Sequence, residues 1–575
     1  MKKYYILIYA CLCCFLLNPS HTLQASNLNP DPEHVYDVII VGGGIAGLTT
    51  AYMLRDKDLL LFEKEDRFGG KIWSDNIKGI SYNIGTQYLI EEDNSFVQML
   101  DEIGVQRNLY SIMDAPMAAY INGQYYHDLT AMPLGPGDLF DLIRIISTAY
   151  QKQKIFQMDP ADPRWKELAR KTLIEIIKTD NEKIMAIFRA YLQGACVTKP
   201  EHVSAGVGAS LMGDIYNTAP FAFVEGGTQK ITDTMVAKLK GKVFNNTLVK
   251  NLKEKDGIVQ VVIERDGNTY TLKSRKAVIA TDAPACLGLL PDCPAWKKTA
   301  LEKIEYGSII TVNVFFKEIP WQRFMGMLVD DVIFTGVIDT TYFNDQSGEE
   351  EAYPKILNFF ISIPPNEKDL KDAMLAKSDQ EIASLAISDF GKIFPGIEMS
   401  DYIVGTRVTK FMHGEVSLTP EFFEILPDLQ KPVGNIHFCG DYTDRISFLR
   451  GAVLSGFRAA RELGSEYVVS QSDEIRFPQT KKWGSSGFVT IIVCVLITLF
   501  GFYLRLARKT HPRYALILII VSIVVLVLTI VYPFYLPPYQ VLYQALGAFI
   551  VVVASLGYFI ALIWNRFKKH RHVNA

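Results

Sequence analysis

The stretch from Val35 to Leu48, VYDVIIVGGGIAGL, constrains the fold of this chain most strongly. It begins as a short apolar run rich in β-branched residues, which predicts a buried parallel strand. Glycines follow at G-x-G-x-x-G spacing, at Gly42, Gly44 and Gly47, and helix-forming residues come after them. This order predicts a strand, a tight turn and a helix at the start of an α/β domain.

The start of such a helix favours an anionic ligand. Its first N–H groups have no partner within the helix and carry the positive end of the helix dipole, so a pyrophosphate binds against them. A second apolar run ends at Glu63, nineteen residues after Gly44, where a carboxylate accepts hydrogen bonds from ribose hydroxyls. The alternative to a ligand site is that the glycines serve only the backbone conformation of the turn and that Glu63 is a solvated surface charge. The order of all these features favours a dinucleotide site.

The length, net charge and cysteine spacing of the chain limit which partners, metal sites and disulfides we expect. The chain has 575 residues, more than one ordinary core needs, and a net charge of −3, so we expect no nucleic-acid partner. Outside the apolar ends lie four cysteines, Cys196, Cys286, Cys293 and Cys439, whose spacing matches neither a zinc site nor a C-x-x-C motif. We expect no metal and four buried thiols. The alternative, in an oxidising compartment, is a disulfide between Cys286 and Cys293.

Both ends of the chain have membrane-like composition. Lys2 and Lys3 precede an apolar run, and a small-residue cleavage point follows near Ala25. This layout predicts a signal peptide over residues 1–25, with an uncleaved N-terminal anchor as the alternative. Near the C-terminus three segments contain no charged residue and approach or exceed the length that crosses a bilayer. The predicted transmembrane helices are 487–504, 514–532 and 541–564.

Basic residues predict the orientation of these helices. One cluster lies between the first two apolar segments, from Arg505 to Arg513, and another follows the third, from Arg566 to Arg571. By the positive-inside rule both clusters face the cytoplasm. We therefore expect a multi-pass C-terminal anchor, with the preceding domain on the non-cytoplasmic side and a polar linker over 471–486.

The middle of the chain alternates strand and helix signals. Asn122-Gly123 between two apolar runs predicts a β-hairpin. Residues 137 to 211 show helical periodicity and predict a separate helical lobe. Residues 242 to 279 predict an antiparallel meander, because Asp-Gly pairs separate its strands. A last strand, glycine turn and helix is predicted from Gly434 to Gly456.

These pieces together resemble the flavin amine oxidase superfamily, which includes plant-type phytoene desaturases and protoporphyrinogen oxidase. The similarity runs from about residue 36 to 464. The segments that carry it are the first glycine turn, Glu63, Gly69-Gly70-Lys71, Gly226-Gly227, the Val249 meander, Ala280-Thr281, and Gly440-Asp441 with Gly451-Ala452.

The resemblance implies a fold and a domain organisation. The expected fold is an α/β FAD-binding domain of the Rossmann-like, glutathione-reductase type, with a mixed α+β substrate domain and C-terminal transmembrane helices. One FAD-dependent domain would cover residues 36–470. Its FAD-binding parts would be about 36–90, 222–305 and 430–464, and its substrate parts about 91–221 and 306–429.

The resemblance also implies non-covalent FAD as cofactor and a set of contacts. Glu63 would bind the adenosine ribose, Lys71, where arginine is usual, would approach phosphate or ribose, and Val249 would touch adenine through its backbone. Asp441 would bind the ribityl and phosphate region, and Gly451 to Val453 would start the helix that points at the isoalloxazine. The remaining expected cofactor residues are Gly42, Gly44, Ile45, Ala46, Gly47, Gly70, Gly85, Thr86, Gly440, Ala452 and Val453.

Departures from the family pattern bear on the chemistry. Thr311 occupies the position of a lysine that helps activate oxygen in amine oxidases. Two electron acceptors are therefore predicted as alternatives, oxygen and another acceptor such as a quinone. The segment from Phe411 to Val416 contains no cysteine for a flavin thioether. Gln87, Thr311, His413 and Phe448 are candidate substrate residues, and no catalytic base is assigned.

The predicted function is therefore a membrane-anchored FAD-dependent oxidoreductase. It would remove hydride from an amine or a lipophilic substrate, and membrane lipid would be a further partner. A phytoene-desaturase-like or protoporphyrinogen-oxidase-like enzyme is one alternative. A membrane scaffold or sensor that binds FAD without turnover is another, and an NAD-linked dehydrogenase fits only the first glycine motif.

Overall fold

The computed structural model describes residues 31, 33–90, 95–110, 116–217, 221–342, 354–446 and 448–466. The predicted signal peptide, the predicted linker over 471–486 and the three predicted transmembrane helices lie outside these residues. Among the helices that the structure describes, none is long and apolar enough to cross a membrane.

The first sheet contains the predicted glycine-turn unit. Its parallel strands pair in the order β10, β2, β1, β13, and β19 joins the far side of β13. The N-terminal half of β13 pairs with β12 instead, and β11, β12 and β13 form the predicted antiparallel meander. The strands are β1 (Val35–Val41), β2 (Leu59–Phe62), β10 (Val243–Phe244), β11 (Leu248–Lys255), β12 (Ile258–Arg265), β13 (Asn268–Ile279) and β19 (Ile436–Phe438).

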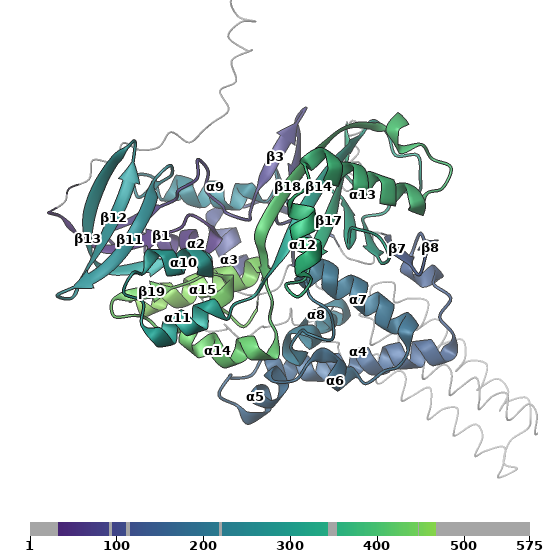
Figure 1. Ribbon diagram of the computed structural model, residues 1–575, viewed down its shortest axis with the longest axis horizontal. Coiled ribbons are helices and arrows are strands. Elements are labelled where there is room, and N and C mark those ends of the chain that lie inside the picture. Colours follow the sequence, from purple (N-terminus) through teal and green to yellow (C-terminus); the bar gives the residue numbers. More distant parts are fainter. Residues whose placement is uncertain are drawn as a thin grey trace, which may run out of the picture.

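Helices cover both faces of this sheet because its central strands are apolar on both sides. Val38 and Ile40 face one core cluster, and Ile39 and Val41 face another. On the first face lie α2 (Ile45–Met53), α3 (Ser95–Ile103), α9 (Gln229–Lys238) and α15 (Phe448–Glu462). On the second lie α10 (Ala283–Leu289), α11 (Ala295–Glu302) and α14 (Pro420–Gln430), as the left half of Figure 1 shows.

The second sheet has the strand order β18, β14, β17, β16, β15, β7, β8. Apolar side chains of one face pack on α12 (Lys368–Leu375) and α13 (Asp379–Ile393). The predicted hairpin is confirmed, because Asn122 and Gly123 between β7 and β8 have φ values of 52° and 72°, as a two-residue turn requires. The strands are β7 (Met117–Ile121), β8 (Gln124–Tyr126), β14 (Tyr306–Phe316), β15 (Gly326–Val329), β16 (Gly336–Asp339), β17 (Lys355–Ile363) and β18 (Ile403–Val416).

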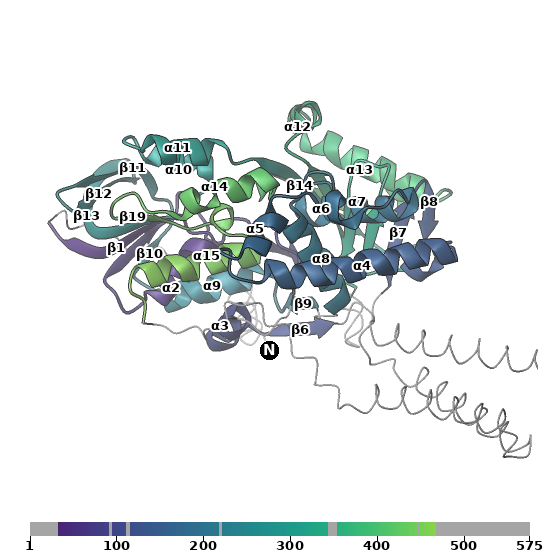
Figure 2. The ribbon, with the colours of Figure 1, turned by 90° about the horizontal axis from the view of Figure 1, so that it is seen from below.

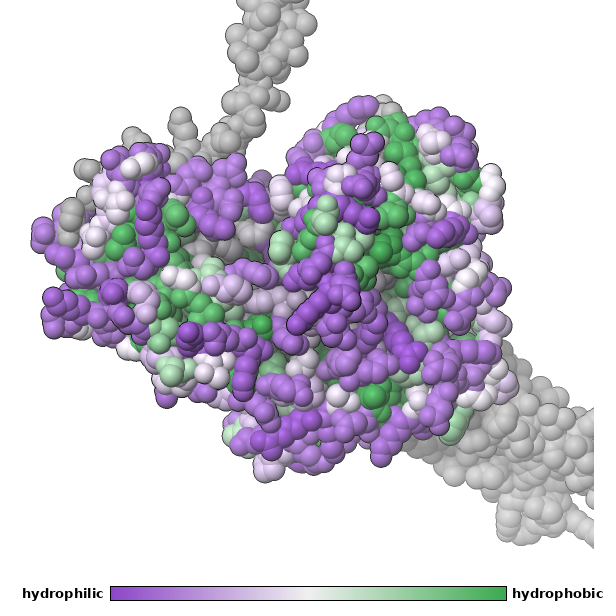
Figure 3. All heavy atoms as spheres, viewed as in Figure 1, coloured by the Kyte–Doolittle hydropathy of each residue, from purple (hydrophilic) through white to green (hydrophobic). Residues whose placement is uncertain are grey.

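The predicted helical lobe is also present and lies beside the second sheet (Figure 2). It contains α4 (Pro136–Phe156), α5 (Pro163–Ala169), α6 (Leu173–Ile177), α7 (Glu182–Cys196) and α8 (Ala205–Asn217). Short strands complete the fold, namely β3 (Ser74–Ile77), β4 (Ile80–Asn83), β5 (Leu89–Ile90), β6 (Arg107–Tyr110) and β9 (Phe221–Val224). Hydrophilic side chains cover most of the face in Figure 3, with apolar residues among them.

The cysteines of the described residues carry free thiols. Cys196, Cys286 and Cys439 are buried, and Cys293 is partly buried. The expectation of four buried thiols is confirmed for three of them, whereas Cys293 is only partly buried, and no disulfide joins Cys286 and Cys293 among the described residues. Burial raises the pKa of Cys286 to about 12 and that of Cys439 to about 11, so these thiols stay protonated.

Candidate functional site

The turn between β1 and α2 leaves room in front of the helix. A side chain at Gly42, whose φ is 108°, would lie 2.8 Å from the carbonyl oxygen of Ala280, and one at Gly47 would collide with the carbonyl oxygen of Gly42. A Cβ on Gly44 would instead have no atom within 4 Å. No side chain caps the first turn of α2, so the amides at Ile45 and those after it are open to an anion.

Glu63 ends β2 and lies across this turn. Its Oε2 accepts a hydrogen bond from the N–H of Gly43 at 2.7 Å, and its Oε1 accepts one from the N–H of Glu65 at 2.9 Å. The N–H of Thr247 donates to the backbone oxygen of Glu63 at 2.8 Å, which brings the start of β11 and the buried Val249 to the same edge. Three segments that the sequence predicts at the adenosine end therefore meet. A carboxylate has lone pairs beyond these two bonds for a further donor.

Lys71 and Asp441 contact each other although 370 residues separate them. Lys71 Nζ lies 2.5 Å from Asp441 Oδ2 and donates to the carbonyl oxygen of Gly414 at 3.0 Å. Asp441 follows Gly440, whose φ of 135° turns the chain out of β19. The partners of Lys71 in this structure are protein groups, and its expected approach to phosphate or ribose stays a prediction. An exposed fraction of 43% still leaves the Lys71 side chain open on one side.

Carboxylates surround the Lys71 ammonium. Burial acts to lower the pKa of Lys71, but the carboxylates of Asp441, Glu415 and Asp282 outweigh it, and the pKa is raised from its ordinary value. Lys71 is therefore a permanent cation where segments from β13, β18 and β19 converge. Nothing in the sequence around Glu415 or Asp282 indicates that they would meet Lys71.

The start of α15 differs from the prediction. The helix begins at Phe448, three residues before Gly451, because Glu415 Oε1 accepts a hydrogen bond from the Phe448 N–H at 2.7 Å. Phe448 itself has a φ of 70°, which a non-glycine residue adopts only under constraint. A side chain at Gly451 would collide with the carbonyl oxygen of Ile446, and Ala452 and Val453 follow in the first turns. Sequence reasoning missed Glu415, which has no local signal.

His413 anchors β18 to the end of β13. Its Nδ1 lies 2.7 Å from Asp282 Oδ2, and its ring lies 5.0 Å from that of Tyr306. Asp282 Oδ1 also accepts from the N–H of Ala285 and caps α10. The Tyr306 hydroxyl accepts a hydrogen bond from the N–H of Ala283 at 3.1 Å. These bonds tie His413 to the neighbouring strand and helix.

The loop after β4 connects Lys71 to the second sheet. The N–H of Thr86 donates to the carbonyl oxygen of Lys71 at 3.2 Å, and a side chain at Gly85 would collide with the same oxygen. Gln87 Nε2 donates to the carbonyl oxygens of Asn83 and Gly85 at 3.2 and 2.8 Å. Gln87 therefore holds this loop in shape.

Thr311 lies on β14, on the face of the second sheet opposite α13. Its neighbours across the strands are Phe360 and Thr409, and its side chain is 1% exposed. Its Oγ1 has no hydrogen-bond partner among the residues that the structure describes. The face that Thr311 shares with Phe360 is partly open, since Phe360 and Thr409 are only half-buried.

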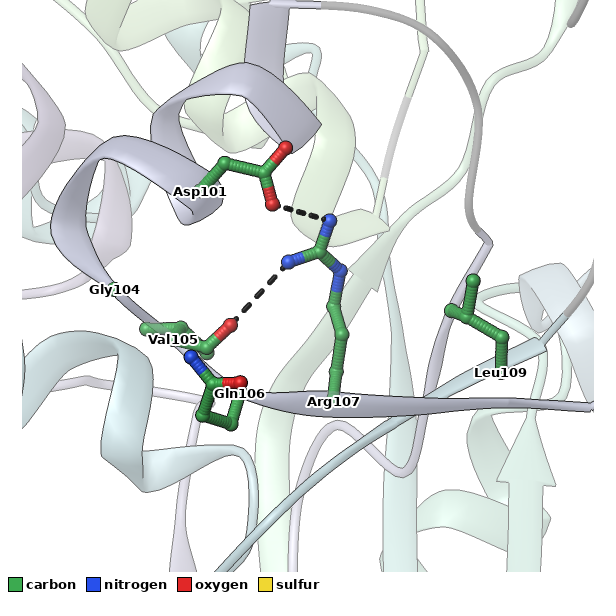
Figure 4. Close-up of a pocket in the computed structure, with 6 residues that line it drawn as sticks. All are labelled: Asp101, Gly104, Val105, Gln106, Arg107 and Leu109. Atoms are coloured by element: carbon green, nitrogen blue, oxygen red, sulfur yellow. Dashed lines mark hydrogen bonds and ion pairs between the residues drawn. The ribbon is translucent and has the colours of Figure 1, made fainter.

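A surface pocket elsewhere does not take part in this site. It lies between α3 and β6, where Arg107 pairs with Asp101 at 2.8 Å and donates to the carbonyl oxygen of Val105 at 3.3 Å (Figure 4). The converging segments of the candidate site contribute none of its lining residues. These are Asp101, Gly104, Val105, Gln106, Arg107 and Leu109.

The fold and the site define a class of protein. A parallel sheet with an uncapped helix start and an acidic residue after the second strand, next to a second mixed sheet, defines a dinucleotide-binding protein with two sheets, an arrangement that suits a flavin cofactor. The chain belongs to the flavin containing amine oxidoreductase family, whose model matches residues 45–464.

Individual relatives agree with this membership. The flavin-containing amine oxidase A of Canis lupus familiaris is 22% identical over 470 residues, which cover 75% of this chain and 85% of the relative. The solved structure of putrescine oxidase bound to putrescine has a TM-score of 0.63 at 18% identity, covering 75% of this chain and 99% of that one. A putative protoporphyrinogen oxidase from Exiguobacterium has a TM-score of 0.56 at 17% identity over the same shares.

FAD is the cofactor that this family implies, and the residues present fit it. The open space at Gly44 and the uncapped start of α2 suit a pyrophosphate, and Glu63 retains lone pairs for ribose hydroxyls. The resemblance of the sequence motifs to the flavin amine oxidase superfamily, and the FAD cofactor that it implies, are confirmed.

Proposed function

We propose that the converging segments bind FAD non-covalently, with the pyrophosphate on the amides of Ile45, Ala46 and Gly47. Glu63 takes the ribose, and the backbone of Val249 lies along the adenine. Asp441 and the first turns of α15 at Ala452 and Val453 face the flavin end. The supporting observation is that these residues, far apart in the sequence, meet around one open helix start.

The non-covalent attachment has its own support. Cys439 is buried against Thr50 of α2, with its Sγ 3.6 Å from the hydroxyl oxygen. Cys286 on α10 is buried in the core, and Cys196 at the end of α7 donates to the carbonyl oxygen of Leu192. Each of these thiols is thus committed to packing in the protein interior.

The proposed reaction transfers a hydride from an amine or a lipophilic substrate. FAD, when bound, accepts two electrons from the substrate C–H bond. We place this bond beside the half-buried face of the second sheet at Thr311 and Phe360, where a bound substrate displaces water. Residues 36–90, 222–305 and 430–464 then form the FAD-binding part, and 91–221 and 306–429 the substrate part.

The identity of residue 311 bears on the electron acceptor of the proposed reaction. Since lysine is absent from this position, we propose an electron acceptor other than oxygen, such as a quinone. A desaturase or a protoporphyrinogen-oxidase-like activity has the same requirement and remains the alternative. The test compares the rates at which air and a soluble quinone reoxidise the enzyme after the substrate has reduced its flavin. Reoxidation by air at the rate obtained with the quinone would contradict the proposal.

The test of the main proposal is an anaerobic titration of the flavin-loaded protein. Amines such as butylamine, putrescine and benzylamine, and isoprenoid lipids in detergent, are added in turn, and the flavin absorbance is followed. Bleaching by an amine supports amine oxidation, and bleaching by isoprenoids alone supports the desaturase alternative. A flavin that none of them bleaches would contradict the oxidation of these amines and isoprenoids and would favour the scaffold or sensor.

We also propose that the protein is membrane-anchored, with this domain on the non-cytoplasmic side. The support is the three charge-free segments after residue 486 and the basic clusters that follow the first and third of them. Protease added to intact cells or spheroplasts should then digest residues 36 to 466. Protection of this region until the membrane is permeabilised would contradict the orientation.

A further inference from the structure

Three buried side-chain amides meet where the loop after β4 touches the second sheet. Asn358 on β17 lies opposite Asn313 on β14, and its Nδ2 donates to Asn313 Oδ1 at 2.8 Å. The same Nδ2 donates to the carbonyl oxygen of Asn83 at 3.3 Å, and Gln87 Nε2 reaches this oxygen at 3.2 Å. Both asparagines are fully buried, and Gln87 is 6% exposed. We call Gln87, Asn313 and Asn358 the amide cluster.

The orientations of these amides follow from the backbone. A carbonyl oxygen only accepts, so Asn83 draws the nitrogens of Asn358 and Gln87 toward itself. Asn358 Oδ1, Gln87 Oε1 and Asn313 Nδ2 then have no partner among the described residues. Each buried polar atom without a partner has lost its hydrogen bonds to water and gained none in return, which destabilises the folded state. Three such atoms on side chains linked by shared hydrogen bonds are each expected to have a partner, and a bound polar group can supply it.

The amide cluster borders the candidate substrate face. On one side, Phe315 and Ile356 are covered by Tyr82 and Ile84 of the β3–β4 hairpin region. On the other side lies Thr311, two residues along β14 from Asn313 and therefore about 7 Å away. This spacing is within reach of an extended substrate whose reacting carbon lies beside Thr311.

We propose that the amide cluster binds a neutral group of the substrate that both donates and accepts hydrogen bonds, such as a hydroxyl or an amide, at the end distant from the oxidised carbon. This inference rests on the proposed function. A hydroxyl donates to Asn358 Oδ1 and accepts from Asn313 Nδ2. A second ammonium offers only donors and leaves Asn313 Nδ2 unpaired, whereas a carboxylate offers only acceptors and leaves Asn358 Oδ1 unpaired.

The charged group nearest in the strand register does not alter this preference. Arg407 on β18 lies opposite Asn313, but its guanidinium pairs with Asp75 and donates to the Tyr82 hydroxyl at 3.3 Å. It also lies 5.0 Å from the ring of Trp73. Arg407 is thus held at the β3–β4 hairpin, away from the amide cluster.

The test compares butylamine, its ω-hydroxy analogue and putrescine as substrates of the flavin-loaded enzyme. We expect kcat/KM for the hydroxy analogue to exceed that for butylamine by about tenfold or more, because a site built for a hydroxyl discriminates against the compound that lacks it. Asn313→Leu should raise KM for the hydroxy analogue about tenfold and leave KM for butylamine unchanged or lower. Asn313→Asp keeps the acceptor for Asn358 and should shift the preference toward putrescine.

Asn268→Leu, at the exposed first residue of β13, is the matched control and should leave all three values unchanged. Equal losses for the three amines in Asn313→Leu, or a lower melting temperature alone, would mean that the amide cluster is structural and would overturn the proposal. If that variant does not fold, Asn313→Asp decides the same comparison. If neither an amine nor an isoprenoid bleaches the flavin, the proposed function fails separately. Equal affinities of butylamine and its hydroxy analogue, titrated by the flavin difference spectrum, would overturn the inference as well.

Discussion

Gly44 and Gly47 lie three residues apart in one turn but have opposite surroundings. A Cβ at Gly47 would collide with the backbone oxygen of Gly42, which cannot move without shifting β1. A Cβ at Gly44 would point into open space, and the φ of −70° at this residue suits alanine. One glycine thus serves the packing of the protein, and the other serves the approach of a ligand.

This contrast predicts different outcomes for two alanine variants. Gly47→Ala should destabilise the flavin-free protein by about 1–3 kcal/mol or more, as overpacking does. Gly44→Ala should leave the melting temperature of the flavin-free protein unchanged and weaken FAD binding about tenfold or more, because the methyl group occupies the place of the pyrophosphate. Thermal unfolding and FAD fluorescence quenching measure the two effects. Similar behaviour of the two variants in both assays would contradict the assignment.

Asp444 gives the stability a pH dependence. It lies between the turn at Asp441–Thr443 and α15, and burial raises its pKa to about 6, although a hydrogen bond from the Ile446 N–H and nearby arginines oppose the shift. In the unfolded chain an aspartate titrates near about 3.9. The folded protein binds the proton more tightly, so the stability from this group is full below pH 4 and is lost as the pH rises through 6.

Asp444→Asn should remove this loss, because the amide oxygen still accepts from Ile446 and carries no charge. Relative to wild type, the variant should gain about 1–3 kcal/mol of stability between pH 4.5 and pH 7. Melting temperatures across this range measure the effect. Asp256→Asn, in the exposed turn between β11 and β12, is the matched control. If the melting temperatures of wild type and Asp444→Asn changed with pH in the same way, the raised pKa of Asp444 would be ruled out.

At the scale of elements, α14 ends on a buried lysine instead of a glycine cap. Lys297 on α11 is fully buried, and its Nζ donates to the carbonyl oxygens of Asp428, Leu429 and Lys431 at 3.0, 2.7 and 3.0 Å. It also lies 3.5 Å from the centre of the Phe438 ring on β19. These contacts satisfy the last carbonyls of α14 and join two helices to the first sheet.

Lys297→Met should therefore destabilise the protein at pH 7 by about 2–4 kcal/mol, because buried carbonyls lose their donors. Burial lowers the pKa of Lys297 to about 7, against about 10.4 for an unfolded lysine. The unfolded chain binds more protons between these values, so wild-type stability should rise from pH 7 to pH 10. The methionine variant should lack this rise. Chemical denaturation at both pH values tests both statements, and a variant as stable as wild type would contradict the cap.

At the scale of the whole molecule, several segments that are distant in the sequence meet at the candidate cofactor site. Lys71 joins β18 through Gly414 and the end of β19 through Asp441, and Glu63 joins the glycine turn to the start of β11. A ligand that contacts all of these segments stabilises the folded state by mass action. The expected gain is about 2.7 kcal/mol when free ligand exceeds its Kd a hundredfold.

We therefore expect the melting temperature of the flavin-free full chain in detergent to rise continuously with added FAD. ADP, which carries the pyrophosphate and adenosine, should give part of this rise, and riboflavin, which lacks both, should give almost none. Differential scanning fluorimetry measures the three curves. Stabilisation by riboflavin equal to that by ADP would contradict a cofactor site centred on α2 and Glu63.

The sequence alone determined the features that depend on local backbone geometry. The glycine turn after β1, the Asn122-Gly123 hairpin, the Asp-Gly turns of the meander and the helical lobe were predictable because positive φ angles and apolar periodicity are properties of neighbouring residues. The resemblance of these ordered pieces was enough to identify the family and FAD.

Tertiary structure alone decided which side chains meet. It pairs Lys71 with Asp441, moves the start of α15 to Phe448 through Glu415, and ties His413 to Asp282. It also forms the amide cluster and places Lys297 at the end of α14. These contacts join residues that lie far apart in the chain and have no shared spacing or period. Their identity depends on how two sheets and their helices pack, which no local pattern encodes.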